Sequence, residues 1–307
     1  MRYLDLPDAP RLTKIGLGTW QFGSREWGYG DAYADRDAAA IVHRSLELGV
    51  TLIDTAEIYA LGGSERIVGA AIRGRRDDVF LATKLFPFLP VSPVVKWRAR
   101  SSAKRLGVTK LDLYQVHQPN PLVRDGTTMR GMRALQDQGL VGEVGVSNYP
   151  VARWREAEKA LGRPVLSNQV SYSLVERGAE QDLIPYAAEH GRIVIAHSSL
   201  ARGFLSAHYD AANRPRNLVR RRNPLFSPES LARAAGLFSA LEEIASAHDA
   251  TPAQIALAWT IRHPNVVAIV GASSVRQVEE NAAAADIELG ADETEVLSAA
   301  AGSFGSR

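Results

Sequence analysis

Short apolar runs recur along the chain at lengths that suit buried strands. Between most of them the apolar positions return every three or four residues, as at 37–48, 64–72, 151–161 and 179–190, which indicates helices that cover a sheet. Strands that alternate with helices in this way are typical of a parallel sheet in an α/β protein. The eight predicted strands are Ile15–Trp20, Val50–Asp54, Val79–Lys84, Leu111–His117, Val141–Ser147, Val165–Val170, Ile193–His197 and Val266–Val270.

Eight such units can close into a barrel or form an open, doubly wound sheet. An open sheet usually carries a glycine fingerprint in its first turn. The nearest stretch here, Gly16 to Gln21, lacks the last glycine and is not followed directly by an amphipathic helix. We therefore expect residues 1–307 to form a single (β/α)8 TIM barrel of eight parallel strands, with the N-terminal segment closing the barrel bottom.

Two stretches after the seventh predicted strand depart from the regular alternation. Residues 203–228 form the longest irregular stretch, in which prolines and asparagines interrupt any regular element. Loops of this length are usually lids or disordered. Residues 227–263 then predict two helices, the second with Thr251 as its N-cap and Pro252 as its first helical residue.

The composition excludes several classes of protein. The chain has no cysteine, which excludes disulfides and thiolate metal sites and agrees with a cytoplasmic location. Its first residues carry acids and prolines instead of the apolar core of a secretory signal, and no stretch is long and apolar enough to span a bilayer. The net charge of +2 does not indicate a nucleic-acid binder, although arginines cluster at 214–222. We therefore expect neither membrane nor nucleic-acid partners.

Polar residues stand at the ends of most predicted strands, where a barrel gathers side chains around one mouth. Each alone could be a helix cap, a solvated strand end or a core histidine with its hydrogen bonds satisfied. Together they would place several ionisable groups around one cavity, which usually marks a functional site. They are Asp54, Lys84, His117, Ser147–Asn148, Asn168–Gln169 and His197–Ser198.

Tyr59 follows Asp54 closely enough in sequence to fold back over the same mouth. A tyrosine with an ordinary pKa of about 10 is a poor acid at neutral pH. A lysine ammonium about 4 Å away contributes roughly 4 kcal/mol at an effective dielectric of about 20, so we expect Lys84 to lower the pKa of Tyr59 well below that value. Asp54 would hold Lys84 charged, and His117 would orient a substrate oxygen or share its proton. The four residues predict a device for proton delivery.

Eight motifs follow one another along nearly the whole chain: GLGTWQFG at 16–23, LIDTAEIY at 52–59, ATKL at 82–85, YQVHQP at 114–119, GVSNY at 145–149, SNQVSYS at 167–173, AHSSLARGFL at 196–205 and IVGASSVRQVEEN at 269–281. In this order they resemble the aldo-keto reductases, in particular the broad bacterial and potassium-channel-β-subunit branches. The resemblance implies a catalytic tetrad of Asp54, Tyr59, Lys84 and His117. It also implies that NADPH, with NADH less favoured, reduces an aldehyde or ketone while Tyr59 protonates the oxygen, without a metal.

The resemblance further implies which residues hold the cofactor. Ser147, Asn148 and Gln169 should hold the nicotinamide carboxamide. His197 stands where the family most often has a ring-stacking tyrosine. The full implied set is Thr19, Trp20, Asp54, Ser147, Asn148, Gln169, His197, Ser198, Leu200, Arg202, Gly271, Ser273, Gln277, Glu280 and Asn281.

The positive charge that would bind a 2′-phosphate is missing from its usual place. Gly271 and Gln277 stand at the positions of the Lys and Arg pair that other branches use. Arg202, Arg276 or the cluster at 214–222 could supply the charge, since a guanidinium binds phosphate through two hydrogen bonds. For the cluster, a solvated loop is the main alternative. We expect the long loop after the seventh strand to lie over the cofactor.

The resemblance and the loop positions also imply an apolar substrate wall beside the tetrad. The implied substrate residues are Trp20, Trp27, Tyr59, Phe86 and His117, with Phe88 as a further candidate. We expect an NADPH-dependent oxidoreductase that reduces an aldehyde or ketone to an alcohol. Two alternatives stay open: a cofactor-sensing regulatory subunit with little turnover, and a barrel that acts on phosphorylated metabolites without nicotinamide.

Overall fold

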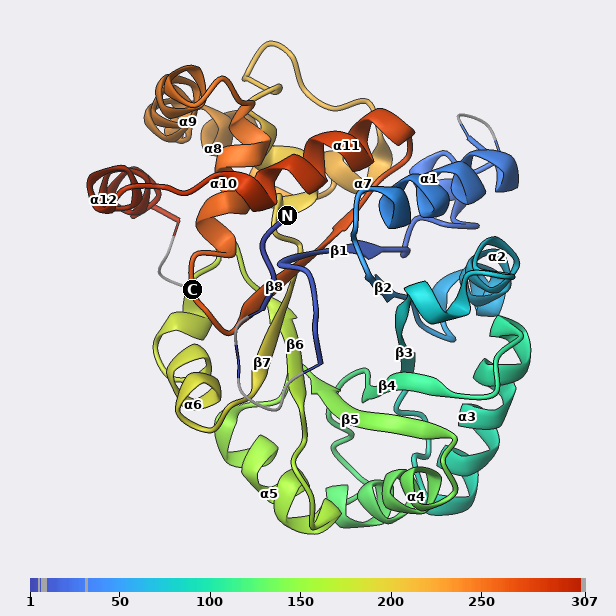
Figure 1. Ribbon diagram of the computed structural model, residues 1–307. Coiled ribbons are helices and arrows are strands. Elements are labelled where there is room, and N and C mark those ends of the chain that lie inside the picture. The colour runs from blue at the N-terminus through green and yellow to red at the C-terminus, as the bar shows by residue number, and fades with distance from the viewer. Residues whose placement is uncertain (5, 7–9, 31–32, 305–307) are drawn as a thin grey trace.

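Eight parallel strands close into a barrel, and helices surround it (Figure 1). The computed structural model describes residues 1–4, 6, 10–30 and 33–304. Strands that follow one another in the chain pair with one another, and β1 pairs with β8 to close the ring. The predicted (β/α)8 barrel is confirmed. The strands are β1 Ile15–Gly18, β2 Leu52–Asp54, β3 Phe80–Leu85, β4 Leu111–Val116, β5 Val141–Ser147, β6 Ser167–Ser171, β7 Ile193–His197 and β8 Val266–Gly271.

The outer helices pack one apolar face against the barrel. In the first of them the buried residues Ala38, Ile41, Val42 and Leu46 recur at the helical period, while its other face carries charges. The α-helices are α1 Asp35–Glu47, α2 Gly63–Ala71, α3 Ser92–Leu106, α4 Asp125–Asp137, α5 Val151–Leu161, α6 Leu183–Glu189, α7 Leu218–Arg221, α8 Pro228–Arg233, α9 Ala235–Ala247, α10 Pro252–Thr260, α11 Val275–Ala283 and α12 Ala291–Ala300.

The long stretch after β7 contains more helical structure than the sequence predicted. Besides α7 it holds two short 3-10 helices, η5 (Ala201–Ser206) and η6 (Pro224–Phe226). Asn217 caps α7 and Asn223 caps η6, because their side-chain oxygens accept hydrogen bonds from the backbone amides that follow. The asparagines that interrupt the pattern therefore start short helices.

Residues 227–263 form three helices, so the prediction of two was wrong. The break between α8 and α9 falls at Ala234, whose φ of −78° and ψ of −8° depart from regular helical values. Its side chain is fully buried, so the apolar pattern runs through the break and could not reveal it. The predicted start of α10 is confirmed, since Thr251 and Gln254 each accept a hydrogen bond from the other's backbone amide.

The barrel interior has an apolar lower half and a polar mouth. Side chains two residues apart on a strand face the same way, so an apolar residue near the bottom is followed by a polar one near the mouth, as in Leu113 and Gln115. Leu4 and Leu12, from the described part of the N-terminal segment, pack into the lower half, which confirms that this segment closes the bottom. The lower cluster consists of Leu4, Leu12, Leu52, Ala82, Leu113, Leu166, Ile193, Ile195, Val267 and Ile269.

Candidate active site

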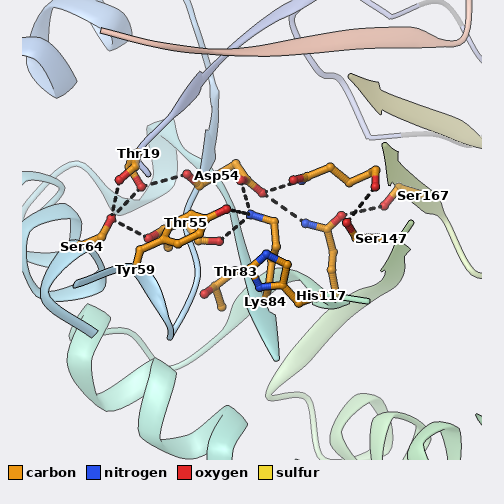
Figure 2. Close-up of polar contacts among 12 residues, drawn as sticks. Thr19, Asp54, Thr55, Tyr59, Ser64, Thr83, Lys84, His117, Ser147 and Ser167 are labelled. Carbon is orange, nitrogen blue, oxygen red and sulfur yellow. Dashed lines mark hydrogen bonds and ion pairs between the residues drawn. The ribbon is translucent and has the colours of Figure 1, made fainter. Parts of the chain in front are cut away.

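The barrel mouth holds a buried lysine that contacts three groups (Figure 2). Lys84 lies on β3, is fully buried, and forms an ion pair with the carboxylate of Asp54 on β2. Its ammonium also donates hydrogen bonds to the carbonyl of Thr55 at 3.0 Å and to the hydroxyl of Tyr59 at 3.2 Å. The structure therefore brings both Asp54 and Tyr59 into direct contact with Lys84.

Tyr59 reaches the mouth because the chain turns sharply directly after it. The 3-10 helix η2 (Tyr59–Gly62) includes Ala60 with φ of 48°, in the left-handed region that is costly for a residue with a side chain. Gly62 follows with φ of 80°, and a Cβ at this position would lie 2.6 Å from the Arg105 side chain. The turn is strained and closely packed, and it holds the tyrosine in one place.

Two amides hold Asp54 from the side opposite Lys84. The Nε2 atoms of Gln115 and Gln169 donate to Oδ2 of Asp54 at 3.2 and 2.9 Å. Gln169 is one of the expected cofactor residues. Gln115 was missed in the sequence, although it stands two residues before His117 and so belongs to the same inward face of β4.

Three buried hydroxyls form a hydrogen-bond network beside the ends of β1 and β2 (Figure 2). Thr19 donates to the carbonyl of Asp54 at 2.9 Å and lies 2.9 Å from the hydroxyl of Ser64, which is in turn 2.9 Å from that of Thr55. Thr19, an expected cofactor residue, is fully buried in this network. In the structure its hydroxyl fixes the backbone at the end of β2.

Burial changes the proton affinity of Lys84 and Tyr59. Burial alone would lower the pKa of Lys84, but Asp54 and Tyr59 outweigh it, so this pKa lies above its usual value. Burial also raises the pKa of Tyr59 by more than Lys84 lowers it, with Asp54 adding to the rise. The expected lowering of the Tyr59 pKa was wrong, because the cost of desolvating a phenolate exceeds the attraction of the ammonium. Lys84 therefore stays charged, and Tyr59 keeps its proton at neutral pH.

Two histidines at the mouth are uncharged. The rings of His117 and Tyr59 meet edge to face, with centroids 5.8 Å apart. Burial, together with Lys84 and His197, lowers the pKa of His117 to about 3. Burial, together with Lys84 and Arg202, lowers the pKa of His197 to about 4. Nδ1 of His117 is buried without a hydrogen-bond partner in the part of the chain that the structure describes. His117 can thus donate or accept a hydrogen bond, but it does not act as a cation.

The residues expected to hold a carboxamide lie together at the ends of β5 and β6. The hydroxyl of Ser147 donates to the Gln169 carbonyl at 2.8 Å, and Nδ2 of Asn148 donates to the Ser147 hydroxyl at 3.1 Å. Asn148 has φ of 59°, which turns the chain directly after the strand. These side chains form one group with both donors and acceptors.

Gly271 lies against the end of the Gln21 side chain. A Cβ at this position would lie 2.7 Å from the carboxamide of Gln21, which itself donates to the carbonyl of Ala272 at 2.7 Å. Asn281 on α11 donates to the Gly271 carbonyl at 3.4 Å. A side chain at 271 would therefore have to displace a bonded glutamine.

The other expected phosphate residues surround the start of α11. Ser274 caps this helix, and Oε1 of Gln277 accepts a hydrogen bond from the Ser273 amide at 2.8 Å. Arg276 is highly exposed and pairs with Glu280, with Nε and Oε1 2.7 Å apart. The side chains of Gln277 and Glu280 thus both contact residues that lie only four positions earlier in the chain.

The segment after β7 reaches across to the loop after β1. The guanidinium of Arg202 lies 5.9 Å from the ring centroid of Trp20, and that of Arg220 lies 5.5 Å from Trp27. The two tryptophan rings meet edge to face at 5.4 Å. Asn217 donates to the carbonyl of Glu26 at 2.7 Å. The arginine cluster is therefore partly anchored through Arg220, while its remaining members Arg214, Arg216, Arg221 and Arg222 are exposed.

The remaining expected residues lie at the ends of β3 and β7. Phe86 is partly buried directly after β3, whereas Phe88 is exposed. Ser198 has φ of 57°, and its hydroxyl lies 3.1 Å from Nδ1 of His197. Leu200 precedes η5 and is partly buried.

Across the described residues we find no group of three acidic or histidine side chains that could hold a metal ion. None of the helices in residues 1–4, 6, 10–30 and 33–304 has both the length and the apolar character needed to cross a membrane.

Comparison with known proteins gives matches over almost the full chain. The family model for aldo/keto reductases matches residues 14–301. An uncharacterized oxidoreductase of Mycobacterium tuberculosis is 55% identical over 99% of this chain and 94% of its own. The methylglyoxal reductase YeaE of Escherichia coli is 34% identical over 93% of this chain and 90% of its own.

Solved structures of similar proteins share the fold. An aldo/keto reductase from Klebsiella pneumoniae, in complex with NADP and acetate, is 32% identical with a TM-score of 0.75 and covers 96% of this chain and 93% of its own. The glycerol dehydrogenase of Gluconobacter oxydans is 25% identical with a TM-score of 0.89, over 98% of this chain and 95% of its own.

Proposed function

The chain belongs to the aldo/keto reductase family, and on that premise we propose that it is an NADPH-dependent oxidoreductase that reduces an aldehyde or ketone to an alcohol. The observation that carries this proposal is the buried ammonium of Lys84, which contacts both the Asp54 carboxylate and the Tyr59 hydroxyl. Complexes of aldo/keto reductases from Klebsiella pneumoniae with NADP and with NADPH support the choice of cofactor.

Tyr59 is the proposed proton donor to the substrate oxygen. Because its pKa is raised by burial, its hydroxyl is protonated at neutral pH. Lys84 donates to this hydroxyl and stabilises the phenolate that remains when the proton leaves, while Asp54 keeps Lys84 charged. Neutral His117 offers a ring nitrogen to the substrate oxygen. When bound, NADPH supplies the hydride to the carbonyl carbon.

The side chains at the ends of β5, β6 and β7 fit a nicotinamide. The Ser147 hydroxyl lies within hydrogen-bond reach of the Asn148 amide and of the main-chain carbonyl of Gln169, and the Gln169 amide donates to Asp54. This set of donors and acceptors suits a carboxamide that must both donate and accept. His197 offers a neutral ring at the position of the stacking tyrosine.

The start of α11 fits the phosphate end of the cofactor. The first amides of this helix suit an anion, the Ser273 amide and hydroxyl would join them on releasing Gln277, and Arg276 or Arg202 would supply positive charge. Since Gln277 stands in place of an arginine, we propose that NADPH is preferred but that NADH also binds.

The variant Tyr59→Phe tests the proposed acid. We expect kcat to fall about 10²- to 10⁴-fold while the Kd for NADPH, from fluorescence titration, stays nearly unchanged. Activity is measured as NADPH oxidation with nitrobenzaldehyde, methylglyoxal and a simple ketone. Full activity in the variant would show that Tyr59 is not the acid.

A cofactor-sensing regulatory subunit is not favoured, because all four tetrad residues are present and three of them are in contact. We further propose that the whole chain works as one domain on a small carbonyl compound in the cytoplasm. The family match over residues 14–301 and the absence of cysteine from the sequence support this.

A further inference from the structure

The loop after β3 is held by an ion pair that the proposed mechanism does not use. Glu57 follows β2 and Arg98 lies on α3, and Nε of Arg98 is 3.0 Å from Oε2 of Glu57. Oε1 of Glu57 accepts a hydrogen bond from the Phe86 amide at 2.5 Å. The Arg98 guanidinium donates to the carbonyls of Phe86 at 2.8 Å and of Phe88 at 3.2 Å. The pair therefore forms hydrogen bonds with the peptide groups on both sides of Phe86.

This clamp of Glu57 and Arg98 connects two segments of the candidate active site. Glu57 stands between Asp54 and Tyr59 in the chain, and its own amide donates to the carbonyl of Lys84 at 3.4 Å. Phe86 follows Lys84 by two residues. The clamp thus joins the loop that carries the proposed acid to the loop that carries an expected substrate residue.

The same loop is tied to the loop after β4. Nδ2 of Asn120 donates to the carbonyl of Pro87 at 2.7 Å, and its Oδ1 accepts from the amides of Leu122 and Val123 at 2.7 Å each. Phe88 is 72% exposed and Leu122 is 92% exposed, so both loops present apolar side chains to solvent at the mouth side. The clamp and Asn120 therefore together hold the backbone of the loop that carries Phe86, the residue expected in the apolar substrate wall.

Stability alone does not account for this ion pair. The side chains of Glu57 and Arg98 are only 8% and 18% exposed, and burial raises the pKa of Glu57 even though the Phe86 amide and Arg98 oppose the rise. The attraction within a largely buried ion pair is mostly offset by desolvation, so its net stabilisation is small. What such a pair does fix is geometry, because each of its hydrogen bonds has a preferred direction.

An equivalent arrangement at the other end of β3 offers a matched control. Oδ2 of Asp112 accepts hydrogen bonds from Arg76 at 2.6 Å and from the Leu81 amide at 2.8 Å. Arg76 also donates to the carbonyls of Val79 at 2.7 Å and Lys110 at 2.9 Å. This second clamp has the same chemistry but lies at the barrel bottom, away from the mouth.

We propose that Glu57 and Arg98 are positioning residues that set the place of Phe86 relative to Tyr59, and thereby the fit of the body of the substrate. This inference rests on the proposed carbonyl reductase function. It predicts that loosening the clamp harms substrates with a bulky body and spares a small one, because a small carbonyl compound does not need the wall.

The test compares Arg98→Met with Arg76→Met. In Arg98→Met we expect the KM for nitrobenzaldehyde to rise at least about tenfold, with a smaller rise for methylglyoxal and an unchanged Kd for NADPH. Arg98→Lys should recover part of the loss. Arg76→Met should leave the ratio of the two KM values as in the wild type. If both methionine variants lower the unfolding temperature alike and neither changes that ratio, the pair is an ordinary structural contact and the proposal is overturned.

Hydrogen exchange gives a readout that does not depend on turnover. We expect the amides of Phe86 and Phe88 to exchange faster in Arg98→Met and in Glu57→Gln, but not in Arg76→Met. Unchanged exchange at these amides overturns the clamp even if the enzyme is active. An inactive wild type with faster exchange in both clamp variants refutes the reductase function while supporting the clamp.

Discussion

Replacing Lys84 by methionine tests whether the ion pair at the barrel mouth offsets the free-energy cost of burying the Asp54 carboxylate. The Asp54 side chain is 2% exposed, its Oδ1 faces Lys84, and its Oδ2 accepts from the amides of Gln115 and Gln169. A buried charge that loses its partner costs about 3–5 kcal/mol. Because two amides remain on Asp54, we expect the lower part of this range, about 3 kcal/mol, which lowers the Tm by about 5 °C in a chain of this size.

The pH dependence of Lys84→Met separates this cause from lost packing. Without the ammonium, the folded variant relieves its buried charge by taking up a proton that the unfolded chain does not hold. The stability deficit should therefore be full at neutral pH and shrink as the pH falls into the range where carboxylates titrate. Urea unfolding of wild type and variant at several pH values measures this, with Asp54→Asn/Lys84→Met as the control that regains most of the loss. A deficit below about 1 kcal/mol, or one that is constant with pH, refutes the reasoning.

Three further predictions concern the histidines and the tyrosine turn. Burial lowers the pKa of His117 to about 3 and of His197 to about 4, so as the pH falls both histidines take up protons in the unfolded chain before they do in the folded one. The Tm should therefore fall as the pH drops from about 6.5 to 4, and His197→Gln should reduce that fall. An equally steep fall of the Tm in His197→Gln would contradict this prediction. His197→Tyr supplies a larger ring and should lower the Kd for NADPH roughly threefold in a fluorescence titration; a weaker complex would argue against ring stacking there. Gly62→Ala places a side chain at φ of 80° against Arg105, so we expect a loss of more than about 1 kcal/mol in urea unfolding and a lower kcat, and a neutral effect would show that the turn can relax.

The sequence carries enough information to place the strands and their polar ends. Parallel strands buried on both faces give apolar runs, and a polar residue that ends such a run lies at the mouth by geometry alone. Asp54 and Lys84 are placed together in this way, and Tyr59 follows because it stands only five residues after Asp54. The same alternation puts Gln115 on the face of His117, but a glutamine inside a strand does not by itself indicate a site.

What the sequence could not show depends on loop conformation and on solvent exclusion. Glu57 and Arg98 are far apart in the chain, and only the folded loop brings both to the peptide groups of Phe86. The direction of the Tyr59 pKa depends on how completely water is excluded from the hydroxyl, which a motif does not record. The break between α8 and α9 at Ala234 is likewise invisible in the sequence, because a buried alanine continues the apolar pattern on both sides of it.

The division of the barrel interior into an apolar floor and a polar mouth has a consequence for folding errors. Leu113 at the floor and Gln115 at the mouth share one face of β4, so a slip of that strand by a single residue would turn both outward together. The lower cluster would lose the side chain of Leu113, and Asp54 would at the same time lose its hydrogen bond from Gln115. A misregistered molecule would therefore be neither stable nor active, and a population of this protein should not contain well-folded but chemically impaired forms of that origin.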